Sequence, residues 1–260
     1  MVGLIEERSG SGIAIVTLAA PETLNALSGD MLRALALTFD RIAADLSIRV
    51  VILRAQGKAF SAGHDLKEMQ GFRRDADQGR ARLQGLFELC SGVMQKVAAL
   101  PQPVIAQVQS VATAAGCQLA CTCDLIVASE TARFGVNGIN LGLFCSTPAV
   151  ALSRRLAPGM TFELLTTGEF LSAPRAHSLG VVNRLAAPDD LEAETLALAQ
   201  SIAAKDPEAI RLGKRAFQAQ LGQPLPQAYA IAGAKMVENA LFPAADQGIQ
   251  AFIDRKPGKA

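Results

Sequence analysis

AFSAGHDLKEM, residues Ala59–Met69, opens with a turn of small residues between a predicted strand at Arg49–Leu53 and a predicted helix. A second turn of the same kind, ATAAGCQ at Ala112–Gln118, also precedes a helical stretch. Small residues let a ligand approach the backbone, and the first N–H groups of a helix have no partner within the helix. Two such donors that converge on one point form an oxyanion hole, which stabilises negative charge on a carbonyl oxygen. Close packing of a helix would produce the same composition without any function.

The chain around these turns alternates between predicted strands and helices. Strands are predicted at Ile13–Leu18, Arg49–Leu53, Pro103–Gln107 and Asp124–Ala128, with a fifth starting at Arg133; helices are predicted at Gly29–Ala44 after an N-cap at Ser28, at Asp77–Leu100 and at Ala114–Cys121. From about Thr147 the strands nearly stop, and four or five helices separated by prolines follow. The pattern predicts a mixed α/β core over residues 1–190 and a helical region over residues 191–260. Helical ends of this kind often supply subunit contacts.

Composition and charge narrow the possible partners. The 260 residues are 50% hydrophobic, enough for a well-filled core, and the net charge is only +1. A chain with so little net charge has no electrostatic field that would attract nucleic acid or an anionic membrane. The start of the chain, MVGLIEERSG, lacks the apolar run of a secretory signal, and no segment approaches the roughly 20 apolar residues of a membrane helix. We therefore expect a cytoplasmic protein without membrane contact.

Five cysteines, an odd number without a secretory signal, favour reduced thiols over a disulfide framework. Cys117, Cys121 and Cys123 lie close together in sequence, but their spacing is not that of a zinc knuckle and no histidine is nearby. Free cysteine packs as a small hydrophobic residue. We expect buried structural thiols and no metal.

Four blocks of the chain resemble the crotonase superfamily, also called the enoyl-CoA hydratase/isomerase family. Ala59–Met69 is similar to the family block A-F-(S/C)-A-G-x-D-(L/I)-K-E-M, and Ala114–Leu125 (AAGCQLACTCDL) is similar to G-G-G-C-E-L-A-x-x-C-D-(I/L). Arg133–Leu143 (RFGVNGINLGL) matches F-G-x-P-E-x-x-L-G in outline, and Phe170–Val182 resembles a later block of small residues. Because the blocks occur in family order over nearly the whole chain, the sequence is identified as a member of this family.

This resemblance implies a fold and a ligand. The fold is an α/β crotonase (ClpP-like) spiral of ββα units, followed by C-terminal helices that assemble homotrimers, commonly paired into hexamers. The ligand is an acyl-coenzyme A thioester, with coenzyme A as part of the substrate and no separate cofactor. The two oxyanion-hole donors would be the backbone N–H groups of His64 and Ala115. The family block has glycine where this chain has Ala115. Alanine keeps the backbone N–H donor, provided that the local φ and ψ suit a Cβ atom.

The resemblance also implies a place for coenzyme A. The first block, with Ala62, would contact the adenine, and cations would face the phosphates. Lys58 and Lys67 are the candidates, with the terminal pair Arg255–Lys256 as a further one. Each of these cations could equally be an ordinary solvated side chain.

The chain departs from the hydratase pattern at both acids. Hydratases of the family use two glutamates to activate water and to move a proton to Cα, and these positions correspond to Gln118 and Gly138 here. An amide does not titrate in the useful range, and glycine has no side chain. General acid–base catalysis contributes roughly 10²–10⁴-fold to rate, so efficient hydration by the two-glutamate mechanism is not expected.

Other residues near these positions could take part in binding or proton transfer. The His64 imidazole could titrate near neutral pH, although we expect it to point toward the coenzyme. Cys145 is expected to line the acyl pocket, because a nucleophilic thiol needs an activating base and none is evident in the sequence. Asn137 and Gln118 can hydrogen-bond a water or a substrate hydroxyl without titrating.

Three functions remain open from the sequence. LGLFCSTP at Leu141–Pro148, together with the two turns, resembles the enoyl-CoA hydratase domain-containing proteins that lack both glutamates. The chain could be an enzyme that stabilises an acyl-CoA enolate for isomerisation, decarboxylation or thioester hydrolysis. It could instead be a non-catalytic acyl-CoA-binding protein, or an oligomeric partner of another enzyme.

Overall fold

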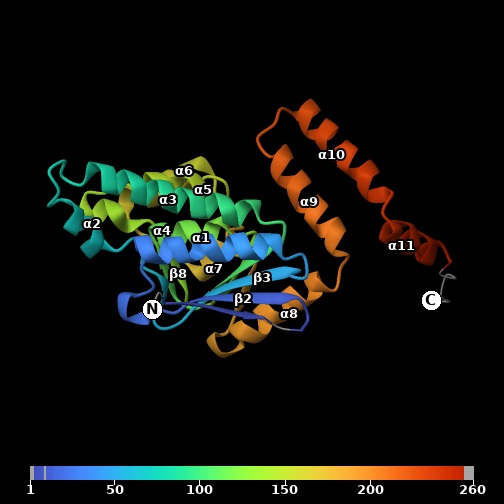
Figure 1. Ribbon diagram of the computed structural model, residues 1–260, viewed down its shortest axis with the longest axis horizontal. Helices are drawn as coiled ribbons and strands as arrows, with labels where there is room; N and C mark the ends of the chain where they lie inside the picture. The colour runs from blue at the N-terminus through green and yellow to red at the C-terminus, as the bar shows by residue number, and fades with distance from the viewer. Residues whose placement is uncertain (1–2, 9, 255–260) are drawn as a thin grey trace. The chain divides into compact units, whose positions relative to one another are not determined.

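A computed structural model describes residues 3–8 and 10–254 of the chain (Figure 1). The chain divides into two compact units, Met1–Ile202 and Ala203–Ala260. The first unit contains every strand of the described residues, and the second consists of three helices. No helix among the described residues is both long and apolar enough to cross a membrane.

Two sheets form the first unit. The larger sheet has the strand order β1-β2-β3-β5-β7-β10, and the smaller has the order β4-β6-β8-β9. The larger sheet consists of β1 (Leu4–Arg8), β2 (Ile13–Leu18), β3 (Val50–Ala55), β5 (Val104–Val108), β7 (Leu125–Ser129) and β10 (Arg184–Ala186); the smaller consists of β4 (Ala59–Ser61), β6 (Val111–Thr113), β8 (Arg133–Gly135) and β9 (Phe170–Ser172). All pairs are parallel except β1 with β2 and β8 with β9.

Helices follow the strands in a repeated order. The first unit contains α1 (Gly29–Ala44), α2 (Leu66–Phe72), α3 (Arg80–Ala99), α4 (Ala115–Thr122), α5 (Ser146–Leu152), α6 (Pro158–Thr167), α7 (Ala173–Ser178) and α8 (Leu191–Ala203); the second contains α9 (Pro207–Gln220), α10 (Leu225–Ala240) and α11 (Pro243–Ile253). Three times the chain enters the larger sheet, crosses to the smaller one and continues into a helix: β3-β4-α2, β5-β6-α4 and β7-β8-α5. This repetition is the predicted spiral of ββα units, and the α/β fold class is confirmed.

Local chemistry sets the helix boundaries. Ser28 caps α1 as expected, since its hydroxyl oxygen accepts the N–H of Met31 at 3.3 Å. The long helix α3 begins at Arg80, three residues later than its predicted start at Asp77. The Asp77 carboxylate accepts the N–H groups of Gly79 and Ala81, so it stabilises the turn that leads into the helix.

The core lies where the larger sheet is covered by helices. Strands β3 and β5 are almost entirely buried, which explains their continuous runs of valine and isoleucine. On α1, Leu32, Leu35 and Phe39 recur at helical spacing and are buried in the same cluster. This core holds the strand ends that carry the candidate site.

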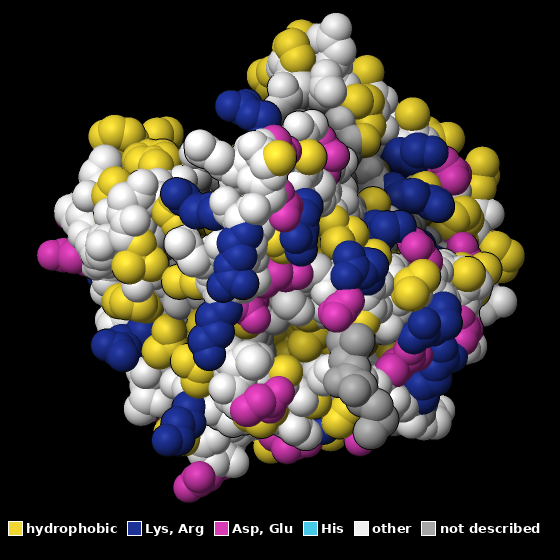
Figure 2. Space-filling model, turned by 60° about the vertical axis from the view of Figure 1, so that its left-hand side comes forward, with side chains coloured by type: hydrophobic (Ala, Val, Ile, Leu, Met, Phe, Trp, Pro, Cys, Tyr) yellow, Lys and Arg dark blue, Asp and Glu magenta, His cyan; other side chains and the backbone are white. Residues whose placement is uncertain are grey.

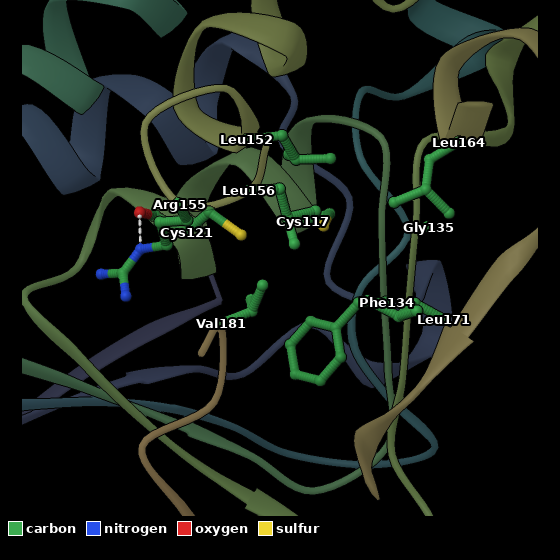
Figure 3. A pocket seen from close by; sticks show the side chains of 10 residues that line it. All are labelled: Cys117, Cys121, Phe134, Gly135, Leu152, Arg155, Leu156, Leu164, Leu171 and Val181. Carbon is green, nitrogen blue, oxygen red and sulfur yellow. Dashed lines mark hydrogen bonds between the residues drawn. The ribbon is translucent and has the colours of Figure 1, made fainter. Parts of the chain in front are cut away.

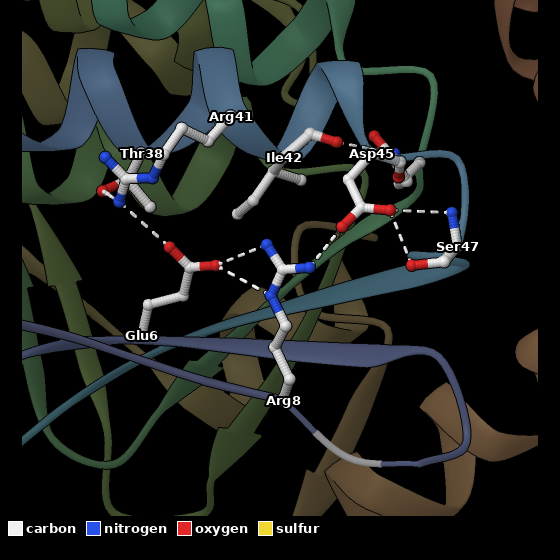
Figure 4. A network of polar contacts seen from close by, with 8 residues as sticks. Glu6, Arg8, Thr38, Arg41, Ile42, Asp45 and Ser47 are labelled. Atoms are coloured by element: carbon white, nitrogen blue, oxygen red, sulfur yellow. Dashed lines mark hydrogen bonds and ion pairs between the residues drawn. The ribbon is translucent and has the colours of Figure 1, made fainter.

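Charged side chains fix the edge strand β1 to the end of α1 (Figure 4). Glu6 accepts hydrogen bonds from Arg8 and Arg41, and Arg8 also pairs with Asp45. The hydrogen bond from the Ser47 hydroxyl, together with the Arg8 guanidinium, lowers the pKa of Asp45 to about 2. The Asp45 carboxylate therefore stays charged through the whole physiological pH range.

The second unit exposes an apolar surface. Its helices α9 and α10 pack against each other as a hairpin, and α10 contacts α11. Large apolar side chains on all three helices are exposed in the single chain: Phe217, Leu221, Leu225, Tyr229, Met236, Val237, Leu241, Ile249, Phe252 and Ile253. Exposed apolar surface of this extent marks an interaction region.

Candidate active site

Three turns meet at one edge of the smaller sheet. Strands β4, β6 and β8 are neighbours and run parallel, with Ser61 paired to Ala112 and Thr113 paired to Gly135. The carboxyl ends of parallel strands lie at the same edge of a sheet. Three segments begin at this edge: the turn with His64, the turn with Ala115 and the loop with Gly138. The order of the strands therefore brings together segments that are far apart in sequence.

The first two turns are in direct contact. A Cβ atom built on Gly63 would lie 2.9 Å from Ala114 Cβ and 3.1 Å from the backbone nitrogen of Ala115. A Cβ atom built on Gly116 would lie 2.4 Å from the carbonyl oxygen of Ser61. Gly63 also has a φ of +89°, a conformation that favours glycine. Both glycines are therefore required for the two turns to approach this closely.

A preceding loop holds the His64 turn in place. Leu27 donates its N–H to the Gly63 carbonyl at 2.7 Å, and Ala62 donates its N–H to the Leu24 carbonyl at 3.0 Å. Between them Asn25, fully buried, accepts the N–H of Ala20 and donates to the carbonyls of Gln56 and Ala59. This loop could not be predicted from a local sequence pattern, because its hydrogen bonds join segments about 35 residues apart.

The two predicted donors are unpaired where the turns meet. Within residues 3–8 and 10–254, the N–H groups of His64 and Ala115 form no hydrogen bond. Ala115 begins α4 with an ordinary backbone conformation, so its Cβ is tolerated. Ala114 before it has φ 49° and ψ −123°, a region that glycine occupies readily and alanine does not.

Replacing Ala114 with glycine is expected to raise the free energy of unfolding by up to about 1 kcal/mol. Relief of the strained backbone exceeds the entropic cost of adding a glycine to the unfolded chain. Urea denaturation of both proteins measures the difference. Ala112→Gly is the matched control, since Ala112 is buried in β6 with negative φ and its replacement should destabilise the fold. A destabilised Ala114→Gly variant would contradict this interpretation.

The third loop lies beside the second turn. The Thr113 hydroxyl donates to Asn137 Oδ1 at 2.6 Å, which leaves the amide Nδ2 of Asn137 available as a donor. At the next residue, a Cβ atom on Gly138 would lie 2.6 Å from the Leu143 carbonyl oxygen and 2.8 Å from Cys145 Sγ. The Cys145 thiol is buried, and burial raises its pKa. The space that a side chain at residue 138 would enter is thus filled.

Gln118 is buried in α4, where only 4% of its surface is exposed. Its Oε1 has no hydrogen-bond partner among the described residues. The amide is neutral at every pH of interest, so this side chain can form hydrogen bonds but cannot transfer a proton. The two positions assigned to the hydratase acids from the resemblance are therefore an uncharged amide, at Gln118, and a glycine whose Cβ position is blocked, at Gly138.

The His64 side chain is fixed by its neighbours. Its Nδ1 lies 3.1 Å from the Leu27 carbonyl oxygen, and its ring meets the Phe87 ring of α3 edge-on at 5.4 Å between centroids. Burial lowers the pKa of His64, while the hydrogen bond to Leu27 and the charge of Glu68 act in the opposite direction. Sequence reasoning gave no sign of Phe87.

The two predicted coenzyme A cations that the structure describes are both exposed. Lys58 is exposed just before β4, and Lys67 is exposed in the first turn of α2. His64 is six positions after Lys58, which allows at most about 20 Å between them along the chain. Arg255 and Lys256 lie outside the described residues. Over the face drawn in Figure 2, cationic, acidic and apolar side chains are mixed and not gathered into one charged field.

An apolar pocket lies on another side of α4 (Figure 3). It is lined by Cys117, Cys121, Phe134, Gly135, Leu152, Arg155, Leu156, Leu164, Leu171 and Val181. At 100° per residue, the two cysteines point well away from Ala115 around the helix, so this pocket is separate from the turns. A hydrogen bond to Cys121 and burial both raise the pKa of Cys117. All five cysteines are free, as predicted, and the burial expected for Cys117, Cys121 and Cys123 is confirmed.

Comparison with known proteins identifies the family of this chain. Its sequence matches the family model described as "Enoyl-CoA hydratase/isomerase" over residues 8–259. The chain belongs to the enoyl-CoA hydratase/isomerase family. Within this family it is 42% identical, over 98% of its length and 83% of the relative, to the mouse protein named "Enoyl-CoA hydratase domain-containing protein 3, mitochondrial".

Solved structures of the enoyl-CoA hydratase/isomerase family have the same fold. The crystal structure of an enoyl-CoA hydratase from Mycobacterium smegmatis superposes with a TM-score of 0.93 at 48% identity, covering 98% of both chains. That of the human enoyl coenzyme A hydratase domain-containing protein 3 gives 0.91 at 38% identity, covering 99% of this chain and all of the other. The predicted resemblance to the family and to its domain-containing proteins is confirmed.

Proposed function

We propose that this protein binds an acyl-CoA thioester and stabilises its enolate through the backbone N–H groups of His64 and Ala115. The observation that carries the proposal is the contact between the two turns, where the Cβ position of Gly63 lies 3.1 Å from the Ala115 nitrogen. This contact supports the proposal that two unpaired donors from different chain segments lie side by side. Donors fixed before the reaction stabilise a developing oxyanion at no cost in reorganisation.

Hydration by two carboxylates is not the proposed reaction. Gln118 does not titrate, and the space beside Gly138 is occupied by the Leu143 carbonyl and the Cys145 thiol. The site fits isomerisation, decarboxylation or thioester hydrolysis better than hydration. These reactions need the oxyanion hole but can use a different proton-transfer group. Asn137 and Cys145 are proposed to contact the acyl group, and Ala62, Lys58 and Lys67 to contact the coenzyme.

Calorimetry with matched ligands tests the proposal. Butanoyl-CoA carries the thioester carbonyl, whereas S-butyl-CoA is a thioether that lacks it. Two hydrogen bonds to the carbonyl oxygen, each worth about 0.5–1.5 kcal/mol, should make the thioester bind roughly 5- to 150-fold tighter. Equal affinities for the two ligands, or no binding of either, would refute the proposed oxyanion hole. If Lys58 and Lys67 contact the coenzyme, Lys58→Gln and Lys67→Gln should each lower the affinities for butanoyl-CoA and S-butyl-CoA by the same factor.

A binding protein without catalysis is the second candidate, favoured by the replacement of both acids. Turnover assays on a panel of enoyl-, malonyl- and 3-hydroxyacyl-CoA esters distinguish an enzyme from a binding protein. Product formed above background from any ester supports the enzyme, whereas tight binding without product over hours supports the binding protein.

The exposed apolar surface of α9, α10 and α11 supports a homotrimer, or a dimer of trimers. Light scattering should give three or six times the 27.2 kDa chain mass. Met236→Glu and Tyr229→Glu, at side chains that are 66% and 72% exposed, should lower this mass without unfolding the chain. Monomers at all protein concentrations would contradict the assembly. Cytoplasmic location stays a prediction, and fractionation of cells tests it.

A further inference from the structure

The hydrogen bonding of the His64 ring leaves one of its nitrogen atoms as a bare acceptor. Nδ1 faces the Leu27 carbonyl oxygen at 3.1 Å, and a carbonyl oxygen can only accept a hydrogen bond. The ring proton of the neutral imidazole is therefore placed on Nδ1, and Nε2 keeps its lone pair.

This Nε2 atom is buried and has no hydrogen-bond partner among the residues that the structure describes. The apolar Phe87 ring packs edge-on against the imidazole. Buried polar atoms are rarely left without a partner, and each exception needs an explanation. A second unpaired acceptor, Oε1 of Gln118, belongs to the helix that starts at Ala115. Both atoms therefore belong to the two segments that supply the oxyanion hole.

We propose that Nε2 of His64 removes a proton from Cα of the bound acyl thioester. This inference rests on the proposed function, because the backbone N–H of the same residue would hold the carbonyl oxygen, which is two bonds from Cα. One residue would then supply a donor to the oxygen and a base to the carbon.

The step is a proton transfer that needs no further reactant. The Cα–H bond breaks and its electron pair forms the carbon–carbon double bond of the enolate. The π electrons of the carbonyl move to the oxygen, which faces the N–H groups of His64 and Ala115. The proton stays on the imidazolium, which the Leu27 carbonyl and the charge of Glu68 stabilise, and then returns to carbon.

Other titratable groups of the site are engaged or unsuited to this step. The Glu68 carboxylate accepts the N–H of Gly29 at 3.0 Å, and Asp65 accepts the N–H groups of Lys67 and Glu68 as the cap of α2. The Cys145 thiol stays protonated, because burial raises its pKa. Burial lowers the pKa of His64, so its imidazole is neutral at neutral pH and ready to accept a proton.

Exchange of the Cα protons of butanoyl-CoA into D₂O, followed by NMR, tests the inference. This saturated thioester cannot be hydrated, so exchange reports proton transfer alone. His64→Gln and His64→Asn keep the backbone N–H and can still donate to Leu27, but neither titrates. Each should slow the exchange about 10²- to 10⁴-fold with less than about a threefold change in Kd. His177→Gln is the matched control, because Nδ1 of His177 also contacts a carbonyl, that of Val182 at 2.9 Å, and it should change neither quantity.

The pH profile adds a signature that a structural role would not produce. The charged neighbour that acts on His64 is Glu68 of α2, while Leu27 and Phe87, which pack on the ring, carry no charge. The exchange rate should fall as the pH drops through a pKa below the ordinary 6.5 of histidine, and the His64→Gln variant should lose this limb. Undiminished exchange in both His64 variants, or butanoyl-CoA that binds without exchange, would overturn the inference and leave thioester binding intact. Failure of butanoyl-CoA to bind would instead refute the proposed function.

Discussion

Replacing Gly63 with alanine is expected to abolish most turnover and to weaken thioester binding. The added Cβ would lie 2.9 Å from Ala114 Cβ and 3.1 Å from the Ala115 nitrogen, at a φ of +89°. The two turns would have to separate, and the donors of His64 and Ala115 with them. Loss of one oxyanion donor lowers kcat by about 10²- to 10³-fold, so exchange or turnover should fall at least that far.

A glycine with the same backbone strain but open space provides the control for Gly63. Gly180 has a φ of +79° and no heavy atom within 4 Å of its built Cβ. Gly180→Ala should lose stability, because of its positive φ, and retain full activity. If Gly63→Ala were as active as Gly180→Ala, the contact between the turns would not be what forms the site.

Placing glutamates at the two positions assigned to the hydratase acids, by Gln118→Glu with Gly138→Glu, is not expected to produce hydratase activity. A side chain at residue 138 would meet the Leu143 carbonyl at 2.6 Å and Cys145 Sγ at 2.8 Å, and the backbone carbonyl cannot move without moving its loop. Overpacking of this kind typically costs about 1–3 kcal/mol of stability. We expect a less stable protein with no gain in hydration of crotonyl-CoA, measured by the loss of absorbance of the conjugated thioester.

Two further variants separate overpacking from the loss of the acids. Gly138→Ala adds only the Cβ and should already be destabilised, whereas adding Cys145→Gly to Gly138→Glu should recover part of the stability by removing one of the two contacts. If the Gln118→Glu/Gly138→Glu variant were stable and hydrated crotonyl-CoA, the loop would be able to open. The space beside Gly138 would then not be what excludes a side chain there.

Much of the fold follows from local sequence patterns. The strand at Ile13–Leu18 and the helix at Gly29–Ala44 with its Ser28 cap were predictable, because a buried strand and a capped amphipathic helix each have a local signature. Strands β4, β6 and β9 span three residues each, too few to show any period. Their membership in a second sheet depends on pairing between distant segments, which no local pattern contains.

The candidate site was predictable only in its backbone. Small residues in both turns pointed to close approach, and Gly63 and Gly116 now account for it by the contacts that a Cβ would make. The loop around Asn25, the Thr113 hydrogen bond to Asn137 and the Phe87 contact with His64 arise from tertiary packing. Nothing in their local sequence distinguishes them from ordinary surface or core residues.

The pairing of β4 with β6 has a consequence for how such a site can change. Adjacent strands of a sheet lie about 4.8 Å apart, a spacing set by backbone hydrogen bonds and not by side chains. The separation of the two turns is thus set by the backbone of the sheet, whereas the surface beside them carries side chains of other elements, such as Phe87 of α3. The two can vary separately: a side chain such as Phe87 on α3 can be substituted while the spacing of β4 and β6 stays constant.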